Sequence, residues 1–404
     1  MEFDVVIIGA STSGLHTAQK LASAGKKVAV FDRQKRLRPA RCTLIVTPEM
    51  RKLLGGLPAD ILLHRTGTMV LSSSQYTASV RLQESDWIVE RAALTQRLLF
   101  GAQEAGADIF LGCRFRNFEE AGRSTRHEPT VGVHFQNSLH NKVAWAREAV
   151  IGADGINSDV AEAAGIPHPI SVPIVQAEVA LPPNWDPDVT QVWFDPKETR
   201  FFYWLIPEST ERGVVGLVGD EGVQTQQRMR AFLNRHDLEA EAYQGARVAL
   251  HHPHLKPWGK IGNIPLLMVG DAAGQVKITT VGGLVTGIHA AEAAARSVIN
   301  GTAYKAELRL LKRELDLHWL IRLLLDRLDI RGYDLLVGAV SSRLQQFLSR
   351  HNRDNMASVF WQLPFVEPRL LKVAFQCLRG KSAMGWVRSA PAGKALTELT
   401  KPES

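Results

Sequence analysis

The first 32 residues carry the pattern that most constrains how this chain folds. Residues 4–8 (DVVII) form a short β-branched run that ends at Gly9, and small or apolar residues then recur at helical spacing. A second apolar run, residues 27–31 (KVAVF), ends at Asp32. Strand, glycine turn, helix and strand in this order predict a βαβ unit with two parallel strands.

The turn after the first strand carries two of the three glycines of the G-x-G-x-x-G fingerprint of dinucleotide-binding folds. Gly9 allows the tight turn, and Gly14 lets the helix lie close to the strand. Ser11 stands where a glycine normally lets the backbone approach a pyrophosphate, so we expect a weaker or displaced contact there. The helix that starts near Ser13 offers free N–H groups and a positive dipole end to a diphosphate.

The end of the second strand supplies a polar contact of the kind such a site needs. Asp32 is placed to accept hydrogen bonds from a ribose diol. We include the neighbouring Arg33 among the candidate cofactor contacts. These features alone do not separate FAD from NAD.

Two later segments repeat the combination of an apolar strand, small residues and an acid. Residues 150–155 (VIGADG) deliver Asp154 and Gly155, and residues 268–274 (MVGDAAG) deliver an Asp in the same way. Ligands bind at the carboxyl ends of strands in open α/β sheets, and an Asp there can accept hydrogen bonds from sugar or ribityl hydroxyls. The helix that follows can direct its N-terminus at phosphate or at the pyrimidine edge of a flavin.

These three motifs, in this order, resemble those of the FAD-dependent group that contains hydroxylases of the para-hydroxybenzoate hydroxylase fold and the geranylgeranyl reductases. The resemblance covers most of residues 1–300. It implies that the N-terminal fingerprint binds the ADP part of FAD. It also implies that Asp154 and Gly155 adjoin the pyrophosphate, and that Gly270 and Asp271 bind the ribityl chain.

Within this group, residues 275–284 (QVKITTVGGL) are similar to the Q-V-K-P-T-T-G-G-G-I run of geranylgeranyl-reductase-like proteins. The departures are Ile278, Val281 and Leu284, at positions where the backbone is expected to approach the isoalloxazine ring. The hydroxylases usually carry His where this chain has Gly274. The resemblance adds these candidate cofactor contacts: Gly274, Gly282 and Gly283.

Three further segments are similar to motifs of the same group. Arg91, in the piece IVER ahead of a predicted helix, resembles an FAD-contacting arginine. The stretch RPARC resembles the reductases' cysteine-bearing segment and makes Cys42 a candidate proton donor, although a lone Cys is more often a buried, inert residue. Residues 202–207 (FYWLIP) match the reductases at Trp204 and Pro207, and flavin-dependent halogenases also at Ile206, so Trp204 is a candidate substrate-pocket residue.

The resemblance implies a flavin-dependent oxidoreductase that transfers hydride to an isolated alkene of a geranylgeranyl or other polyprenyl chain held in an apolar tunnel. The alternative is a flavin monooxygenase or halogenase acting on an aromatic or polyketide-like substrate. A lipid carrier or non-redox cyclase with this fold stays open as a third class. The electron donor is expected to be NAD(P)H or a ferredoxin, because no second strand, glycine turn and helix for a nicotinamide cofactor follows.

Composition and residue spacing restrict the partners, metals and cellular location that we expect for this protein. The formal charge is +7, but the Lys and Arg residues are scattered without the patterning of a nucleic-acid site, so we expect no nucleic acid. We expect no metal either, because the three His of residues 251–254 have no acidic or Cys partner at ligand spacing.

Three cysteines and no signal-peptide features indicate a reducing, cytoplasmic location. No apolar run reaches the roughly 18 residues of a membrane span, so any membrane contact is peripheral. The oligomeric state stays open.

The order of patterns predicts an α/β fold, α+β overall, in which a Rossmann-like FAD-binding domain holds an inserted antiparallel-sheet substrate domain and precedes a helical C-terminal region. Strand-like runs separated by turns fill residues 170–220, and residues 264–299 return to an α/β pattern. Residues 36–90 give no regular pattern. The predicted regions are 1–165 with 255–302 for the FAD-binding domain, 166–254 for the substrate domain and 303–404 for the helical region.

Overall fold

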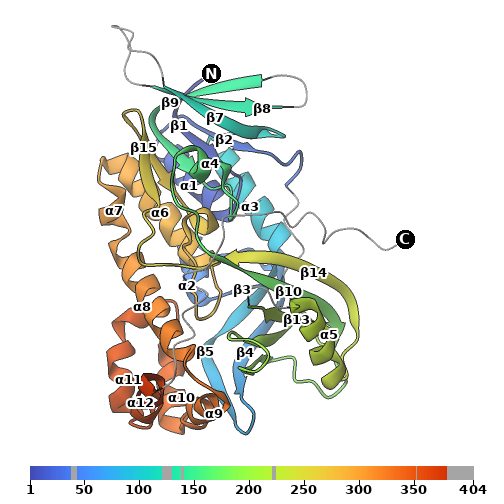
Figure 1. Ribbon diagram of the computed structural model, residues 1–404. Coiled ribbons are helices and arrows are strands. Elements are labelled where there is room, and N and C mark those ends of the chain that lie inside the picture. The colour runs from blue at the N-terminus through green and yellow to red at the C-terminus, as the bar shows by residue number, and fades with distance from the viewer. Residues whose placement is uncertain (38–42, 121–129, 138–140, 221–223, 352, 380–404) are drawn as a thin grey trace.

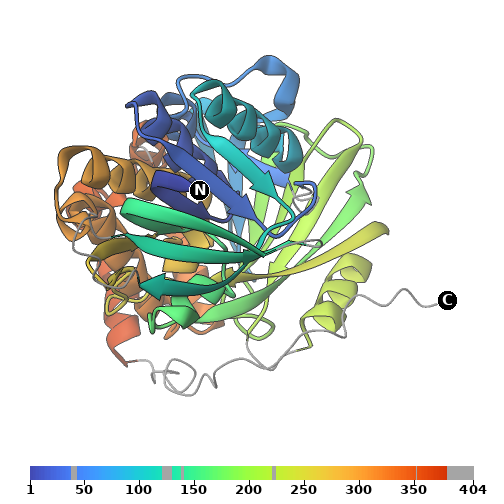
Figure 2. The same cartoon turned by 90° about the horizontal axis from the view of Figure 1, so that it is seen from above.

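The fold was described from a computed structural model, which covers residues 1–404 except 38–42, 121–129, 138–140, 221–223, 352 and 380–404. Two eight-stranded sheets form its frame. Figure 1 shows the first sheet at the end that carries the N-terminus and the second sheet below it, with a column of helices along one side. Seen from above, this column and helix α5 (Thr225–Arg235) lie on opposite sides of the molecule (Figure 2).

The first sheet is built around the strand that opens the chain. Its strands are β1 (Glu2–Ile8), β2 (Val28–Asp32), β6 (Asp108–Leu111), β7 (Arg114–Glu120), β8 (Val131–Gln136), β9 (Asn141–Gly152), β15 (Trp258–Ile261) and β16 (Ile264–Met268). The main order is β15-β16-β9-β1-β2-β6, and all neighbours from β16 to β6 are parallel. The predicted βαβ unit is therefore confirmed, and the carboxyl ends of β1, β2, β9 and β16 share one edge.

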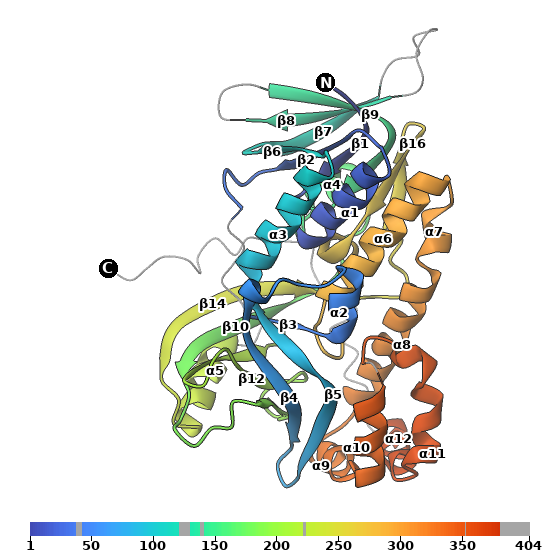
Figure 3. The same cartoon turned by 180° about the vertical axis from the view of Figure 1, so that it is seen from behind.

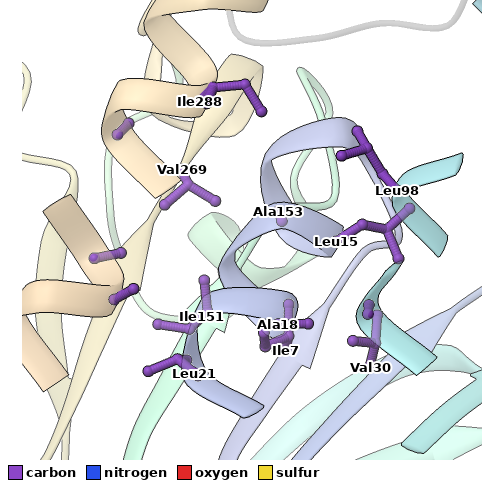
Figure 4. Packing of buried hydrophobic residues seen from close by; sticks show 14 of the residues in the cluster. Ile7, Leu15, Ala18, Leu21, Val30, Leu98, Ile151, Ala153, Val269 and Ile288 are labelled. Atoms are coloured by element: carbon purple, nitrogen blue, oxygen red, sulfur yellow. The ribbon is translucent and has the colours of Figure 1, made fainter. Parts of the chain in front are cut away.

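Three helices cover one face of this sheet: α1 (Thr12–Ser23), α3 (Arg91–Glu104) and α6 (Leu284–Asn300). Their apolar side chains meet those of the strands in a core that contains Leu15, Ile151 and Ile288 (Figure 4). The opposite face packs against β7, β8 and the short helix α4 (Asp159–Ala163). A parallel sheet covered on both faces explains why its strands read as continuous apolar runs.

The second sheet is antiparallel over most of its width, as the fold class requires. Its strands are β3 (Thr43–Val46), β4 (Leu62–Ser72), β5 (Thr77–Glu90), β10 (Ser171–Ala180), β11 (Val189–Trp193), β12 (Tyr203–Pro207), β13 (Arg212–Val218) and β14 (Ala240–Ala249). The order is β14-β10-β13-β12-β11-β4-β5-β3, with a parallel pairing only between β11 and β4 among the described residues. Side chains alternate across β12, so Tyr203 packs against α5 and Trp204 faces the opposite side.

The lack of regular pattern in residues 36–90 was misleading, because these residues contribute β3, β4 and β5 to the second sheet. The hairpin β4–β5 contains two breaks of register, and β5 buries an acid, Asp86, among its apolar positions. Both features interrupt the alternation by which a half-buried strand is recognised. Figure 3 shows this hairpin extending beside α10 (Ser342–Arg350). The predicted division into three regions stays a prediction.

The C-terminal part is helical, as predicted. Besides α10 it contains α7 (Tyr304–Glu307), α8 (Arg309–Leu325), α9 (Ile330–Gly338), α11 (Leu363–Val366) and α12 (Leu370–Arg379). The short helix α2 (Pro48–Leu53), from the N-terminal part of the chain, packs near α6. Over the described parts of the chain, none of the helices combines the length and the apolar character needed to cross a bilayer.

A close contact inside the second sheet gives a stability prediction. A Cβ added at Gly216 of β13 would lie 1.9 Å from Cζ2 of Trp204, whereas one added at Gly245, on the exposed edge strand β14, meets nothing within 4 Å. We expect Gly216→Ala to lower the free energy of unfolding by about 2–3 kcal/mol through overpacking. The control Gly245→Ala should change it by less than about 0.5 kcal/mol in the same denaturant titration. Equal effects would contradict this packing.

An ion-pair cluster between α1 and α6 gives a pH-dependent prediction. His16 and Lys20, whose side-chain nitrogens lie 3.6 and 3.2 Å from Glu292 Oε1, lower the pKa of Glu292 from 4.5 to about 2. Because the folded pKa is depressed, Glu292 stabilises the fold above about pH 4.5, and this contribution is lost as the pH falls toward about 2. We expect Glu292→Gln to cost about 1–2 kcal/mol at pH 7, after allowance for solvent screening.

Chemical denaturation of both proteins from neutral to acid pH checks this expectation. The difference between wild type and Glu292→Gln should shrink as the pH drops. Glu104→Gln is the matched control, because Glu104 lies 4.0 Å from Arg97 at the surface and both side chains are at least half exposed. A pH-independent difference for Glu292→Gln would rule out the carboxylate as its source.

Candidate functional site

The first turn of the chain touches the second motif directly. Gly9 has a φ of +105°, and a Cβ added to it would lie 2.3 Å from the carbonyl oxygen of Ala153. One added at Gly14 would lie 2.3 Å from the carbonyl oxygen of Gly9. Only glycine fits at both positions, so strand β1, helix α1 and the end of β9 approach one another through bare backbone.

Helix α1 connects this turn to the third motif. Ser11 is its N-cap, and its hydroxyl accepts a hydrogen bond of 3.2 Å from the N–H of Gly14. The buried Ser13 packs against Gly270, where an added Cβ would lie 2.9 Å from Ser13 Oγ. The three motifs therefore converge at one edge of the first sheet. At the position of the missing middle glycine, the serine hydroxyl turns toward its own helix.

Asp32 fixes the shape of the same turn. Its carboxylate accepts hydrogen bonds from the N–H groups of Ala10, at 2.8 Å, and Gln34, at 2.7 Å. Each carboxylate oxygen retains a second lone pair that can accept a ligand hydroxyl. A shallow hollow opens beside it. Its lining includes Gly9, Asp32, Arg33, Arg114, Asp154 and Asn157.

Asp154 lies at this hollow, but its carboxylate is engaged by α4. It accepts a hydrogen bond of 2.6 Å from the Ser158 hydroxyl and one of 3.1 Å from the N–H of Val160. Burial raises its pKa, and these two hydrogen bonds oppose that shift. Gly155, with a φ of +85° and open space at its Cβ position, presents backbone instead. The second motif thus offers a ligand chiefly its main chain.

Arg91 and Asp271 come together from separate parts of the chain. Burial raises the pKa of the Asp271 carboxyl, and the nearby Arg91 guanidinium opposes this shift. A Cβ added at Gly283, the residue before α6, would lie 3.2 Å from Asp271 Oδ1. The structure therefore places Arg91 and Gly283, both predicted to contact the cofactor, near the half-buried Asp271, the third such residue.

Gly274 explains one departure from the hydroxylases. It has a φ of +64°, and an added Cβ would lie 2.7 Å from Leu255 Cδ1 and 3.0 Å from Pro169 Cβ. A histidine at this position would need both a left-handed backbone and space that these side chains fill.

These features fit a dinucleotide with a diphosphate. Bare backbone at Gly9 and Gly14 allows close approach, and the N-terminus of α1 directs N–H groups at the turn. Asp32 is available to a ribose, and a hollow that it helps to line lies beside it. The residues present therefore form a suitable cradle for the ADP part of FAD.

Val281 is strained. Its φ of +53° lies in the left-handed region, which is unfavourable for a β-branched residue. This is the position at which the similar reductase run has its first glycine. The side chain is half buried and packs, with the buried Ile278, in an apolar cluster that also contains Trp204 and Leu250. Gly282, which follows, pairs with Lys277 in an isolated bridge.

The same run is fastened to the C-terminal region by polar contacts that sequence reasoning missed. Lys277 forms a buried ion pair with Asp354, which also accepts a hydrogen bond of 2.6 Å from the Thr47 hydroxyl. Burial opposes ionisation of Asp354, but Lys277 outweighs it, and the pKa of this carboxyl is lowered. A lysine between Val276 and Ile278 was the available signal, yet its partner lies 77 residues away.

A second chain of hydrogen bonds also connects residues 275–284 to the C-terminal region. Thr279 shares a hydrogen bond with the buried His318 of α8, whose other ring nitrogen lies 3.1 Å from Glu314. The Glu314 carboxylate also accepts hydrogen bonds from the N–H groups of Met356, at 2.8 Å, and Ala357, at 2.7 Å. Residues 353–357 are therefore tied to the run by two independent routes.

A small pocket lies beside this run. Its walls are mostly apolar, with a polar end formed by two histidines and a buried Arg–Asp pair. The lining residues are Ile170, Leu250, His251, His252, Ile278, Trp319, Arg322, Leu323 and Asp326. Trp204 belongs to the apolar cluster that backs the pocket but is not one of its lining residues.

Cys42, the candidate proton donor, lies outside the described residues. Among the residues that are described, no three or more His, Cys, Asp or Glu side chains gather as a metal site would require. His251 instead pairs with Asp316 at 2.8 Å.

Comparison with known proteins places these features in context. A family model described as FAD binding domain matches residues 2–314. Digeranylgeranylglycerophospholipid reductase 1 of Methanopyrus kandleri is 28% identical over 301 residues, which cover 71% of this chain and 78% of that protein. The crystal structure of a geranylgeranyl bacteriochlorophyll reductase-like protein from Thermoplasma acidophilum superposes with a TM-score of 0.76 at 17% identity, over 92% of this chain and 99% of that one. For p-nitrophenol 4-monooxygenase from Pseudomonas putida the TM-score is 0.61 at 16% identity, over 94% and 99%. The resemblance inferred from the motifs is thus confirmed, and the solved structures share the fold.

The strain at Val281 predicts that a glycine variant at this position is more stable than an alanine variant, the reverse of the usual order. Glycine adopts a positive φ without cost, so Val281→Gly should be more stable than Val281→Ala by about 1 kcal/mol. Val192 is half buried in the same apolar cluster but lies in strand β11, where the order should reverse by about 0.5–1 kcal/mol. Denaturant unfolding of the four variants checks this. The same order at both positions would show that residue 281 is not strained.

Proposed function

The chain belongs to the FAD-binding family whose model spans residues 2–314, and from this premise we propose that it reduces isolated alkene bonds of a polyprenyl lipid. It is an FAD-dependent oxidoreductase. The observation that carries the proposal is the mostly apolar pocket beside residues 275–284, to which that run contributes Ile278. The relatives named as reductases of geranylgeranyl lipids support the same substrate class.

We propose that each of the three converging motifs contacts a different part of FAD. Gly9, Gly14 and the N-terminus of α1 would hold the pyrophosphate, with the backbone at Gly155 beside them. Asp32 would accept hydrogen bonds from the ribose of the ADP part. Asp271 would accept them from the ribityl chain, with Arg91 nearby to balance its charge.

Reduced FAD, when bound, supplies a hydride to one alkene carbon, and the protein must hold the alkene and provide a proton for the other carbon. The apolar cluster behind the pocket serves the first task, because it excludes water from an unactivated double bond. Leu250 and Trp319, which line the pocket, would contact the polyprenyl chain of the substrate directly. The two buried links to Asp354 and His318 hold the run beside the pocket in place.

The proton donor is proposed from resemblance alone. Cys42 has the residue type for it, and the reductase-like stretch around it supports the assignment. Trp204 is proposed as a support for the pocket wall, since it packs in the cluster with Ile278 and Leu250.

For the electron donor, we propose NAD(P)H bound transiently or a ferredoxin. The glycines Gly213 and Gly216 lie inside strand β13 and therefore form no second nucleotide-binding turn. Stopped-flow bleaching of the flavin by each donor distinguishes the two: a fast phase with only one of them identifies it.

A flavin monooxygenase or halogenase is the second candidate. The specific observation in its favour is the Trp204, Ile206 and Pro207 pattern, which is shared with halogenases and occupies the buried strand β12. Oxygen uptake coupled to NAD(P)H oxidation, increased by an aromatic substrate, would favour this candidate over the reductase.

The function is tested with the purified flavoprotein, reduced anaerobically by dithionite and incubated with a panel of prenylated lipids. We expect mass spectrometry to find products that gain two hydrogens for each alkene reduced. Cys42→Ser should lower turnover by about a hundredfold if this thiol delivers the proton. Unchanged turnover would remove that role without affecting the substrate class. Failure of every prenyl lipid to react, while the flavin binds and can be reduced and reoxidised, would overturn the proposal.

A further inference from the structure

The polar end of the pocket beside residues 275–284 contains opposite charges that neutralise each other. Nε of Arg322 lies 2.8 Å from Oδ1 of Asp326, and both residues line the pocket. The Arg322 guanidinium also donates to the Tyr333 hydroxyl, at 3.2 Å, and lies 5.3 Å from the centre of the Phe201 ring. Burial raises the pKa of the Asp326 carboxyl, and Arg322 opposes that shift. Because the guanidinium is buried in these contacts, separating it from Asp326 to bind another anion is costly.

His251, which also lines this end of the pocket, has an acidic partner as well. Its Nε2 lies 2.8 Å from Oδ1 of Asp316. The other oxygen of the Asp316 carboxylate lies 2.6 Å from Nζ of Lys312. The Asp316 carboxylate thus balances the positive charge of Lys312 and holds the His251 ring in place.

His252 brings a hydrogen-bond donor to the pocket without bringing a charge. Burial lowers its pKa from 6.5, and the neighbouring His254 and His251 lower it further, so the ring is neutral at pH 7. Its Nδ1 accepts a hydrogen bond of 3.3 Å from the backbone N–H of His254. A neutral imidazole has one acceptor and one donor nitrogen, so Nε2 carries the proton. This N–H group can donate to a ligand oxygen.

The same end of the pocket is unfavourable for an anion. Helix α8 ends at Leu325, and Asp326 is its C-cap, so the last carbonyl groups of the helix and the negative end of its dipole lie there. A phosphate placed at this end would also meet the Asp326 carboxylate. Among the described residues that line the pocket, neither Arg322 nor His251 offers positive charge without an acidic partner.

We propose that this pocket takes a polyprenyl chain that ends in an uncharged hydroxyl group. The hydroxyl donates to the Asp326 carboxylate, which keeps further lone pairs beside its bond to Arg322, and accepts from Nε2–H of His252. An alcohol matches both groups at once, whereas a phosphate matches only the donor. The inference rests on the proposed function for the identity of the chain, and it deepens that function by naming the polar group at the end of the chain.

Binding to the oxidised holoenzyme tests the proposal, because an oxidised flavin supplies no hydride and turnover cannot interfere. The probes are geranylgeraniol, its methyl ether and geranylgeranyl diphosphate, titrated by calorimetry in one detergent buffer. We expect the alcohol to bind at least about tenfold more tightly than the diphosphate. It should bind about threefold to tenfold more tightly than the ether, which cannot donate a hydrogen bond. Equal or tighter binding of the diphosphate, or equal binding of the alcohol and the ether, would overturn the proposal.

Two variants separate the contributions of the acceptor and the donor. Asp326→Asn leaves the Arg322 charge without its acidic partner, so the ratio of diphosphate affinity to alcohol affinity should rise at least about tenfold. His252→Phe keeps a ring at a half-buried position and should weaken alcohol binding about threefold to tenfold. His254→Phe is the matched control, because this side chain does not line the pocket and its backbone N–H remains. Equal effects of the two Phe variants would contradict the role of His252.

Alkene reduction by the same proteins, started with dithionite, reports separately on the proposed function. An alcohol that binds as expected but gains no hydrogen contradicts the reductase activity and leaves the pocket's preference intact. Faster reduction of the diphosphate than of the alcohol contradicts the preference and leaves the reductase activity intact.

Discussion

The close approach of bare backbone at the first turn is the constraint on which the rest of this structure depends. No side chain fits between Gly9 and Ala153, or between Gly14 and Gly9. Because these positions are glycine, α1 can lie on the sheet and bring Ser13 against Gly270. Three motifs that are far apart in sequence thereby meet at the carboxyl edge of one parallel sheet, where a dinucleotide can contact all of them.

Buried charged and polar side chains connect residues 275–284, near that edge of the sheet, to the C-terminal region. Lys277 lies in an apolar environment, where an unpaired ammonium would cost several kcal/mol, so Asp354 must accompany it. Thr279 and His318 form the second link, which continues to Glu314 and the backbone of residues 356 and 357. The C-terminal helices are therefore part of the site's support. Their inner surface stabilises the run beside the pocket.

Two of the three departures from the reductase-like run have a common physical role. Ile278 and Val281 both place aliphatic side chains in the cluster that backs the pocket, at positions where the similar proteins have proline and glycine. At Val281 the packing is accompanied by a left-handed backbone that costs roughly 1–3 kcal/mol. The chain thus tolerates strain next to the site while gaining a more apolar wall, which fits the proposed reduction of an alkene in an apolar prenyl chain.

By itself, the sequence determined the turns and the order of the main elements. Gly9, Gly14, Asp32, Gly155 and Gly274 act through backbone conformation or neighbours close in sequence, and such local rules can be read from residue type and spacing. Only the tertiary structure decided which buried charges pair, that the Asp154 carboxylate serves α4, and that β4 and β5 extend the second sheet. The reason is that a buried lysine or carboxylate requires a partner, but the chemistry of the residue does not specify where in the chain that partner lies.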